Sequence, residues 1–115
     1  MNMNRATIIG RLTQGPELRA TSTGNVCHMN IAVNGIPKKG TKERPVTYVP
    51  VAVFGKMADT CAANLIAGQE VAIEGRLSFR KRDVAGKKIT VGEVVAQHVD
   101  FGAKPNARPE MAQAA

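Results

Sequence analysis

The stretch EVAIEGRLSFRKR, residues 70–82, decides the fold of this chain. Every second position in it is apolar or glycine: Val71, Ile73, Gly75, Leu77 and Phe79. The positions between them are polar or charged apart from Ala72, and they turn basic from Arg76 onward. Because successive side chains of a strand point to opposite faces, this pattern predicts a β-strand with one wall in a core and the other in solvent. Phe79 is therefore expected in the core or in a subunit contact, and the basic wall is suited to a phosphate backbone.

Strand patterns also account for most of the remaining sequence. The long segments with β-branched or alternating apolar residues are 5–12, 26–34, 46–54 and 88–101. Segment 17–21 is a short extended piece between two turns. Segment 35–45, with two prolines, two glycines and four bases, predicts an exposed, flexible loop.

One helix is predicted among the strands. Residues 56–67 repeat apolar side chains at spacings of three and four, and Gly68 is a suitable stop. Three long strands, a helix and a two-strand hairpin form the order of an oligonucleotide/oligosaccharide-binding barrel. The sequence therefore predicts an all-β domain, a five-stranded OB-fold barrel with one α-helix between strands 3 and 4. Gly10 and Gly75 are expected at sharp bends of the long strands.

The chain is strongly basic. Its 115 residues carry 16 Lys and Arg against 9 Asp and Glu, a formal net charge of +7. The charge is concentrated, because residues 76–88 hold six bases and one acid and residues 38–44 hold four bases and one acid. Such clusters favour a polyanionic partner, either a nucleic acid or an acidic membrane surface. No apolar run approaches the ~20 residues of a membrane span and no signal-peptide core is present, so a membrane partner is not expected.

Catalytic and metal-binding groups are sparse in the sequence. Cys27 and Cys61 have no CxxC spacing and no nearby ligand set, so we expect free thiols of a cytoplasmic protein rather than zinc ligands. His28 and His98 stand alone on strands, where structural or surface roles are expected. No Ser/His/Asp or paired-carboxylate arrangement stands out, and no phosphate-binding glycine-rich loop precedes a helix. The sequence predicts a binding protein without cofactor or metal, not an enzyme.

Four blocks of the sequence resemble the bacterial single-stranded DNA-binding proteins. They are RATIIGRLTQGPELR at 5–19, FGKMA at 54–58, GQEVAIEGRL at 68–77 and GEVV at 92–95. The resemblance implies an OB-fold domain over residues 1–102 that binds single-stranded DNA without sequence preference in replication, recombination or repair. It also implies assembly as a homotetramer, with a dimer as second choice, and a cytoplasmic, nucleoid-associated location. Residues 103–115 are expected to form a short disordered tail.

Two aromatic rings and a set of basic residues form the predicted DNA-binding site. Tyr48 and Phe54 share the side of their strand opposite its three valines, so both rings face outward if the valines fill the barrel. An exposed ring can stack on a base, which contributes about 1–3 kcal/mol. Both rings also match aromatic positions of the family, and Lys56 matches a lysine that faces DNA. The other basic candidates are Arg11, Lys38, Lys39, Lys42, Arg76, Arg80, Lys81, Arg82, Lys87 and Lys88.

The chain departs from the family in two features. It contains no tryptophan, and Pro37 and Arg82 occupy positions where other members carry a stacking tryptophan. Binding is therefore expected to depend more on charge, and to be more salt-sensitive, than in those members. The acidic tip with which members recruit replication and repair proteins is not expected in segment 102–115, because Glu110 is its one acid. Replication or recombination proteins are kept as a further class of partner that the resemblance implies.

Three alternatives stay open at this point. The primosomal replication protein N of bacteria is a short relative with the same barrel, few tryptophans and no acidic tail, and it acts as a dimer in replication restart. A reduced family member carried by a phage or another mobile element also fits. From a different class, the barrel is a protein-interaction module whose basic face binds an acidic partner.

Overall fold

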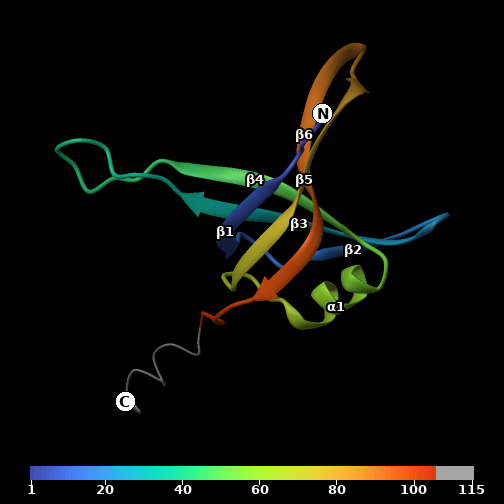
Figure 1. Cartoon of the computed structure of the whole chain (residues 1–115), viewed down its shortest axis with the longest axis horizontal. Coiled ribbons are helices and arrows are strands. Elements are labelled where there is room, and N and C mark those ends of the chain that lie inside the picture. The colour runs from blue at the N-terminus through green and yellow to red at the C-terminus, as the bar shows by residue number, and fades with distance from the viewer. Residues whose placement is uncertain (106–115) are drawn as a thin grey trace.

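The computed structural model describes residues 1–105, so residues 106–115, and with them most of the predicted tail, lie outside the described part. Six strands and one helix follow one another along the chain (Figure 1). They are β1 (Ala6–Leu12), β2 (Glu17–Thr21), β3 (Gly24–Asn34), β4 (Val46–Phe54), α1 (Lys56–Asn64), β5 (Glu70–Val84) and β6 (Lys87–Phe101). Each strand begins and ends within two residues of the segment that the sequence predicts.

Five of the strands close into a ring. Neighbours in the sheet follow the order β1-β5-β6-β4-β3, and β3 returns to β1 through the pairs Arg11–Ala32 and Leu12–Ile31. The remaining strand, β2, pairs with β3 alone and forms a hairpin with it at the edge of the ring. This arrangement, with α1 between β4 and β5, confirms the predicted five-stranded OB-fold barrel.

Apolar side chains from every strand of the ring fill the barrel. Val51 and Val53 of β4, like Val71 and Ile73 of β5, are at most 1% exposed, as the alternation of both strands predicts. Helix α1 packs on β3 and β4 and covers one end of the barrel (Figure 1). The core therefore positions the outward-facing residues of β4 and β5 on a rigid support.

Both cysteines lie in this core as free thiols. Burial raises the pKa of Cys27, and burial together with the nearby Cys27 raises the pKa of Cys61 to about 11. At neutral pH both therefore stay protonated, which is the weakly reactive form of a thiol. They pack as small apolar side chains.

Gly10 and Gly75 lie where barrel strands approach too closely for a side chain. A Cβ at Gly10 would collide with the carbonyl oxygen of Ala32, and a Cβ at Gly75 with that of Val95. The register of β5 against β6 also shifts between Glu74 and Gly75, which marks a β-bulge. The bulge agrees with the bend predicted at Gly75, whereas the bend predicted at Gly10 stays a prediction.

Helix α1 is shorter than predicted. It ends at Asn64 instead of continuing to residue 67, because Leu65 adopts an extended backbone and inserts into the core at 4% exposure. Gly68, expected as the stop signal, lies instead in the following turn with a φ of +82°. The sequence therefore predicted the start of the helix correctly and its last turn wrongly.

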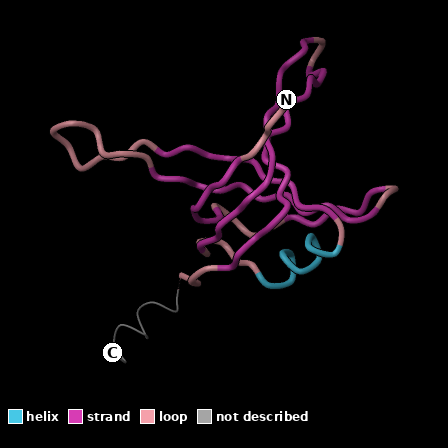
Figure 2. Tube along the Cα trace, in the orientation of Figure 1, coloured by secondary structure: helices cyan, strands magenta, loops and turns pink. Residues whose placement is uncertain are grey.

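Three hairpins project from the barrel (Figure 2). They are the β2–β3 hairpin, the β3–β4 arm with its connection 35–45, and the β5–β6 hairpin with its turn at Ala85–Gly86. The connection 35–45, predicted as a flexible loop, carries hydrogen bonds of its own. The Gly35 amide donates to the Pro45 carbonyl (2.7 Å) and the Lys38 amide to the Glu43 carbonyl (2.8 Å), so these bonds extend the β3–β4 arm towards its tip.

The β5–β6 hairpin shows that the expected core position of Phe79 is wrong, whereas the subunit contact, the other expectation for Phe79, stays a prediction. Leu77 and Phe79, which the alternation assigns to the core wall, are 43% and 66% exposed. Beyond Leu77, β5 and β6 pair with each other alone, so among the described residues no other strand covers this wall. Leu77 and Phe79 lie on the predicted face of β5, but this part of the strand extends beyond the core, so both side chains are exposed.

Candidate nucleic-acid interface

The two predicted stacking rings lie on the outside of the barrel. Tyr48 is 60% exposed and Phe54 is 55% exposed, whereas Val51 and Val53 of the same strand point into the core. The alternation of β4 therefore places both rings outward. Each ring offers a flat apolar surface to solvent, which a base-stacking platform requires.

A row of paired residues links β4 to the arginines of β5. His28 of β3 stands opposite Ala52 of β4, and Ala52 stands opposite Val95 of β6. Val95 in turn stands opposite Arg76 of β5. Residues opposite each other in neighbouring strands share a face, so the row lies on the outer side of the sheet, where Ala52 itself is 0% exposed.

The rings and three arginines belong to this outer surface. Tyr48 and Phe54 have the parity of Ala52 on β4, and the arginines follow one another at alternate positions of β5. Where β4 pairs with β6, at Val51–Val94 and Ala52–Val95, only β6 separates β4 from β5, a span of about 10 Å at two strand spacings. Beyond these pairs the β3–β4 arm and the β5–β6 hairpin diverge (Figure 1). We call this surface the aromatic–arginine wall, and its residues are Tyr48, Phe54, Arg76, Arg80 and Arg82. It combines flat apolar groups with guanidinium groups, which bind phosphate and also stack on bases.

One arginine of the aromatic–arginine wall has an acidic partner. Arg80 Nη1 lies 2.9 Å from Glu93 Oε1, and the Glu93 side chain is only 10% exposed. The carboxylate therefore neutralises part of the charge of the wall and holds the guanidinium against the hairpin. Within residues 1–105, neither Arg76 nor Arg82 forms a salt bridge.

The β5–β6 hairpin carries basic residues on both of its faces. The strand register places Lys87 on the side of the arginines, opposite Val84. Lys81 and Lys88 lie on the other side, which also bears Phe79. We call this second side the reverse face of the hairpin. The cluster that is continuous along residues 76–88 is therefore divided between two surfaces.

Three more predicted lysines lie at the tip of the β3–β4 arm. Lys38, Lys39 and Lys42 belong to its connection, and all three are exposed. The arm continues from the strand that carries Tyr48 and projects away from the barrel (Figure 1). These lysines extend the basic surface beyond the rings.

Lys56 and Arg11 lie at the margins of the site. Lys56 begins α1, two residues after Phe54, and its side chain is exposed. Arg11 donates from Nη1 to the Gly68 carbonyl (3.0 Å), so its guanidinium is directed to the loop between α1 and β5. Of the predicted site residues, Arg11 is therefore the least closely associated with the aromatic–arginine wall.

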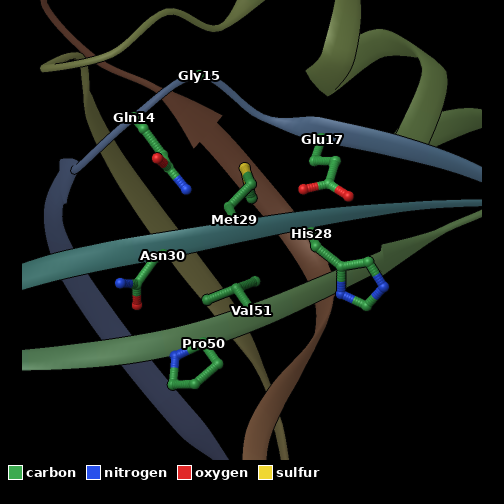
Figure 3. A pocket seen from close by; sticks show the side chains of 8 residues that line it. All are labelled: Gln14, Gly15, Glu17, His28, Met29, Asn30, Pro50 and Val51. Carbon is green, nitrogen blue, oxygen red and sulfur yellow. The ribbon is translucent and has the colours of Figure 1, made fainter.

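A hollow of about 150 Å³ on the outer surface was not foreseen (Figure 3). It lies between the β1–β2 turn and the β3–β4 pair, and its lining residues are Gln14, Gly15, Glu17, His28, Met29, Asn30, Pro50 and Val51. His28 and Asn30 are half-buried there and offer hydrogen-bonding groups on the side of the barrel that carries Tyr48. The sequence could have indicated their position, because His28 and Asn30 alternate along β3 with the core residues Cys27, Met29 and Ile31.

The described part of the chain also limits other kinds of site. Within residues 1–105, no three His, Cys, Asp or Glu side chains come together in a way that could hold a metal ion. No helix in the same range has the length and apolar character needed to cross a bilayer. His98 lies beside Asp100 on the surface, at 2.9 Å between Nε2 and Oδ1.

Comparison with known proteins agrees with the sequence and the fold. The single-strand binding protein family matches residues 3–102. Single-stranded DNA-binding protein 2 of Staphylococcus aureus (strain COL) is 39% identical over 101 residues, which cover 86% of this chain and 73% of that protein. Single-stranded DNA-binding protein 1 of Clostridium acetobutylicum is 35% identical over 102 residues, covering 86% of this chain and 93% of that protein.

Two solved structures share the fold. The Plasmodium falciparum SSB in complex with ssDNA superposes with a TM-score of 0.79 at 17% identity, covering 90% of this chain and 97% of that one. The small single-stranded DNA-binding protein from Streptomyces coelicolor gives a TM-score of 0.72 at 21% identity, covering 94% and 99%. The family match and the two sequence relatives confirm the resemblance. The chain belongs to the single-strand binding protein family.

Proposed function

We propose that this protein binds and protects single-stranded DNA, without sequence preference, during replication, recombination or repair. The observation that carries the proposal is the aromatic–arginine wall, where two exposed rings and three guanidinium groups share one outer surface. Bases stack on Tyr48 and Phe54, and the phosphates follow the arginines. The protein acts by binding in the cytoplasm and not by catalysis.

The remaining basic candidates contribute as peripheral contacts. Lys38, Lys39 and Lys42 hold the strand where it passes the β3–β4 arm, and Lys56 holds it beside Phe54. Lys87 extends the arginine side of the β5–β6 hairpin, and Lys81 and Lys88 lie on its reverse face. Arg11 makes at most a distant phosphate contact, since its guanidinium is bound to the Gly68 carbonyl.

Charge supplies a large part of the affinity in this proposal. The chain has no tryptophan, and each of the two rings supplies about 1–3 kcal/mol by stacking. Each neutralised phosphate adds about −0.7 to the slope of log affinity against log salt for single strands. We therefore expect a steep fall in affinity as salt increases.

We also propose that the protein assembles as a homotetramer, with a dimer as second choice. Residues 6–10 of β1 pair with β5 alone and leave their other edge without a partner in the described chain. Such an edge pairs readily with another strand. Ile9, 60% exposed on β1, adds apolar surface beside it. Light scattering measures the mass in solution. A dimer would favour the alternative that the protein resembles the primosomal replication protein N.

The function is tested by titrating a labelled oligo-dT of several tens of nucleotides, with fluorescence anisotropy as the readout. We expect Tyr48→Ala and Phe54→Ala each to weaken binding by about tenfold, within the range for one lost stack, and to leave the salt slope nearly unchanged. Phe101→Ala is the matched control, because Phe101 is 41% exposed at the opposite end of β6.

Three results would overturn parts of the proposal. Absence of binding at low salt would favour the protein-interaction module. Equal or higher affinity for a duplex of the same length would contradict selectivity for single strands. Unchanged affinity in both ring variants would mean that neither ring stacks on a base.

A further inference from the structure

We propose that Phe79 is a second base-stacking site, on the reverse face of the β5–β6 hairpin. The inference rests on the proposed binding of single-stranded DNA and extends it to a surface outside the aromatic–arginine wall. Phe79 is 66% exposed, more than Tyr48, Phe54 or Phe101, which are the other aromatic residues of the chain. Neither the barrel core nor the aromatic–arginine wall uses this ring.

The residue opposite Phe79 allows its ring to lie flat. Phe79 pairs with Gly92 of β6, and a Cβ at Gly92 would lie 2.5 Å from Cε2 and 2.8 Å from Cδ2 of the ring. The ring therefore occupies the space where a side chain of residue 92 would stand. One side of the ring rests on the backbone of β6, which leaves the other side for a base.

The strand beneath the ring is held in place by the N-terminal segment. The Asn4 side chain donates from Nδ2 to the Leu77 carbonyl (2.7 Å), and its Oδ1 accepts from the Leu77 amide (2.8 Å). The Asn4 side chain thus forms with the Leu77 backbone the two hydrogen bonds that a residue of a paired strand would form, two positions before Phe79. A stacking platform benefits from such support, because less conformational freedom is lost when a base binds.

Cations follow the ring on the same face. Lys81 stands opposite Thr90, and Lys88 stands opposite Asp83, the one acid on the described part of the reverse face. All four side chains are exposed, and Lys81 and Lys88 line a shallow hollow at the tip. A ring followed by two lysines repeats the combination of stacking surface and phosphate contact that single-stranded DNA needs.

The reverse face suits nucleic acid better than a second protein chain. Its exposed apolar groups near the barrel are Phe79 and Leu77, and Lys81 follows Phe79 on the same face. A stable protein interface buries about 800 Å² on each partner, mostly around a larger apolar centre. We infer that a strand leaving the aromatic–arginine wall crosses the hairpin and continues on the reverse face.

The experiment uses Phe79→Trp in the full chain, which otherwise has no tryptophan. We expect its fluorescence to be quenched when oligo-dT of several tens of nucleotides binds. An oligomer short enough to occupy the aromatic–arginine wall alone should quench it much less. Ile66→Trp is the control, because Ile66 is 42% exposed beside the end of α1, away from both surfaces. Anisotropy of the labelled oligomer is recorded in the same titration.

The outcomes separate the inference from the function on which it rests. Binding by anisotropy without quenching of the Phe79→Trp protein would overturn the inference and leave the proposed function standing. No binding by anisotropy would overturn both. Emission that shifts with protein concentration in the absence of DNA would show that the ring lies in a subunit contact, which also overturns the inference.

A second pair of variants gives an independent test. Phe79→Ser is expected to weaken binding of the long oligomer by about tenfold, whereas Phe79→Tyr keeps the ring and the affinity. Binding of the short oligomer should change in neither variant. Equal affinity of both variants for the long oligomer would contradict a stacking role.

Discussion

The two halves of β5 have the same sequence pattern and opposite surroundings. In the barrel half, Glu70–Gly75, the inner side chains Val71 and Ile73 are at most 1% exposed. In the hairpin half, Arg76–Val84, the corresponding Leu77 and Phe79 are 43% and 66% exposed. Alternation assigns a side chain to a face, but the elements packed on that face decide whether it is buried. The difference separates the part of the strand that stabilises the fold from the part available for binding.

Charge changes at the same point of the strand. The barrel half carries Glu70 and Glu74 on its outer positions, whereas the hairpin half carries arginines there. Arg5 lies 3.3 Å from Glu74 and Arg11 stands opposite Glu70, so the barrel half is close to neutral, whereas the basic hairpin attracts a phosphate backbone. A polyanion is therefore directed to the hairpin and the aromatic–arginine wall beside it.

The largest expected effect is on the free energy of unfolding, when one inner residue from each half of β5 is replaced by alanine. Ile73→Ala removes a side chain that is 1% exposed, and a loss of about 2–5 kcal/mol in the free energy of unfolding is expected. Leu77→Ala removes a side chain that is 43% exposed, and its loss should stay below about 1 kcal/mol. Urea unfolding at one fixed protein concentration measures both. Equal losses would mean that another protomer covers Leu77 in solution.

A smaller effect compares one glycine from each region. The Cβ of Gly75→Ala would collide with the backbone carbonyl of Val95, which cannot move freely, so a cost of about 1–3 kcal/mol is expected. The Cβ of Gly92→Ala would meet the exposed ring of Phe79, which can turn aside, so the cost should stay below about 1 kcal/mol. Thermal unfolding ranks the two variants. A Gly92→Ala protein as unstable as Gly75→Ala would show that the hairpin is as tightly constrained as the barrel.

The sequence predicted the faces of the strands well because each face follows from the parity of its residues. Tyr48 and Phe54 are exposed, and Val51 and Val53 are buried, as expected. The end of the helix was missed because the burial of Leu65 ended α1 before Gly68 could do so. That packing depends on the tertiary fold and leaves no local signal.

The division of the hairpin cations could have been derived from the sequence. The two-residue turn Ala85–Gly86, with φ values of +52° and +80°, pairs Val84 with Lys87 and fixes the pairs that follow, as far as Gly75 with Ala96. Lys81 and Lys88 then fall on the reverse face. Where β5 leaves the barrel could not be derived in this way, because it depends on the last pair that β5 makes with β1 at Gly75 and Ala6.

The smallest expected effect compares one paired acid from each region. Glu93→Gln removes the carboxylate that holds Arg80 on the hairpin, and Glu74→Gln removes the one that lies 3.3 Å from Arg5 beside the barrel. Both variants gain one unit of net charge, and both pairs involve exposed arginines, so each should cost less than about 1 kcal/mol of stability. Glu93→Gln alone frees a guanidinium on the aromatic–arginine wall for a phosphate. We therefore expect it to raise the affinity for oligo-dT a few-fold at low salt and to steepen the salt slope by up to about 0.7. An equal gain in Glu74→Gln would mean that net charge, rather than the position of Arg80, controls binding, and that the two halves of β5 do not differ in the way proposed.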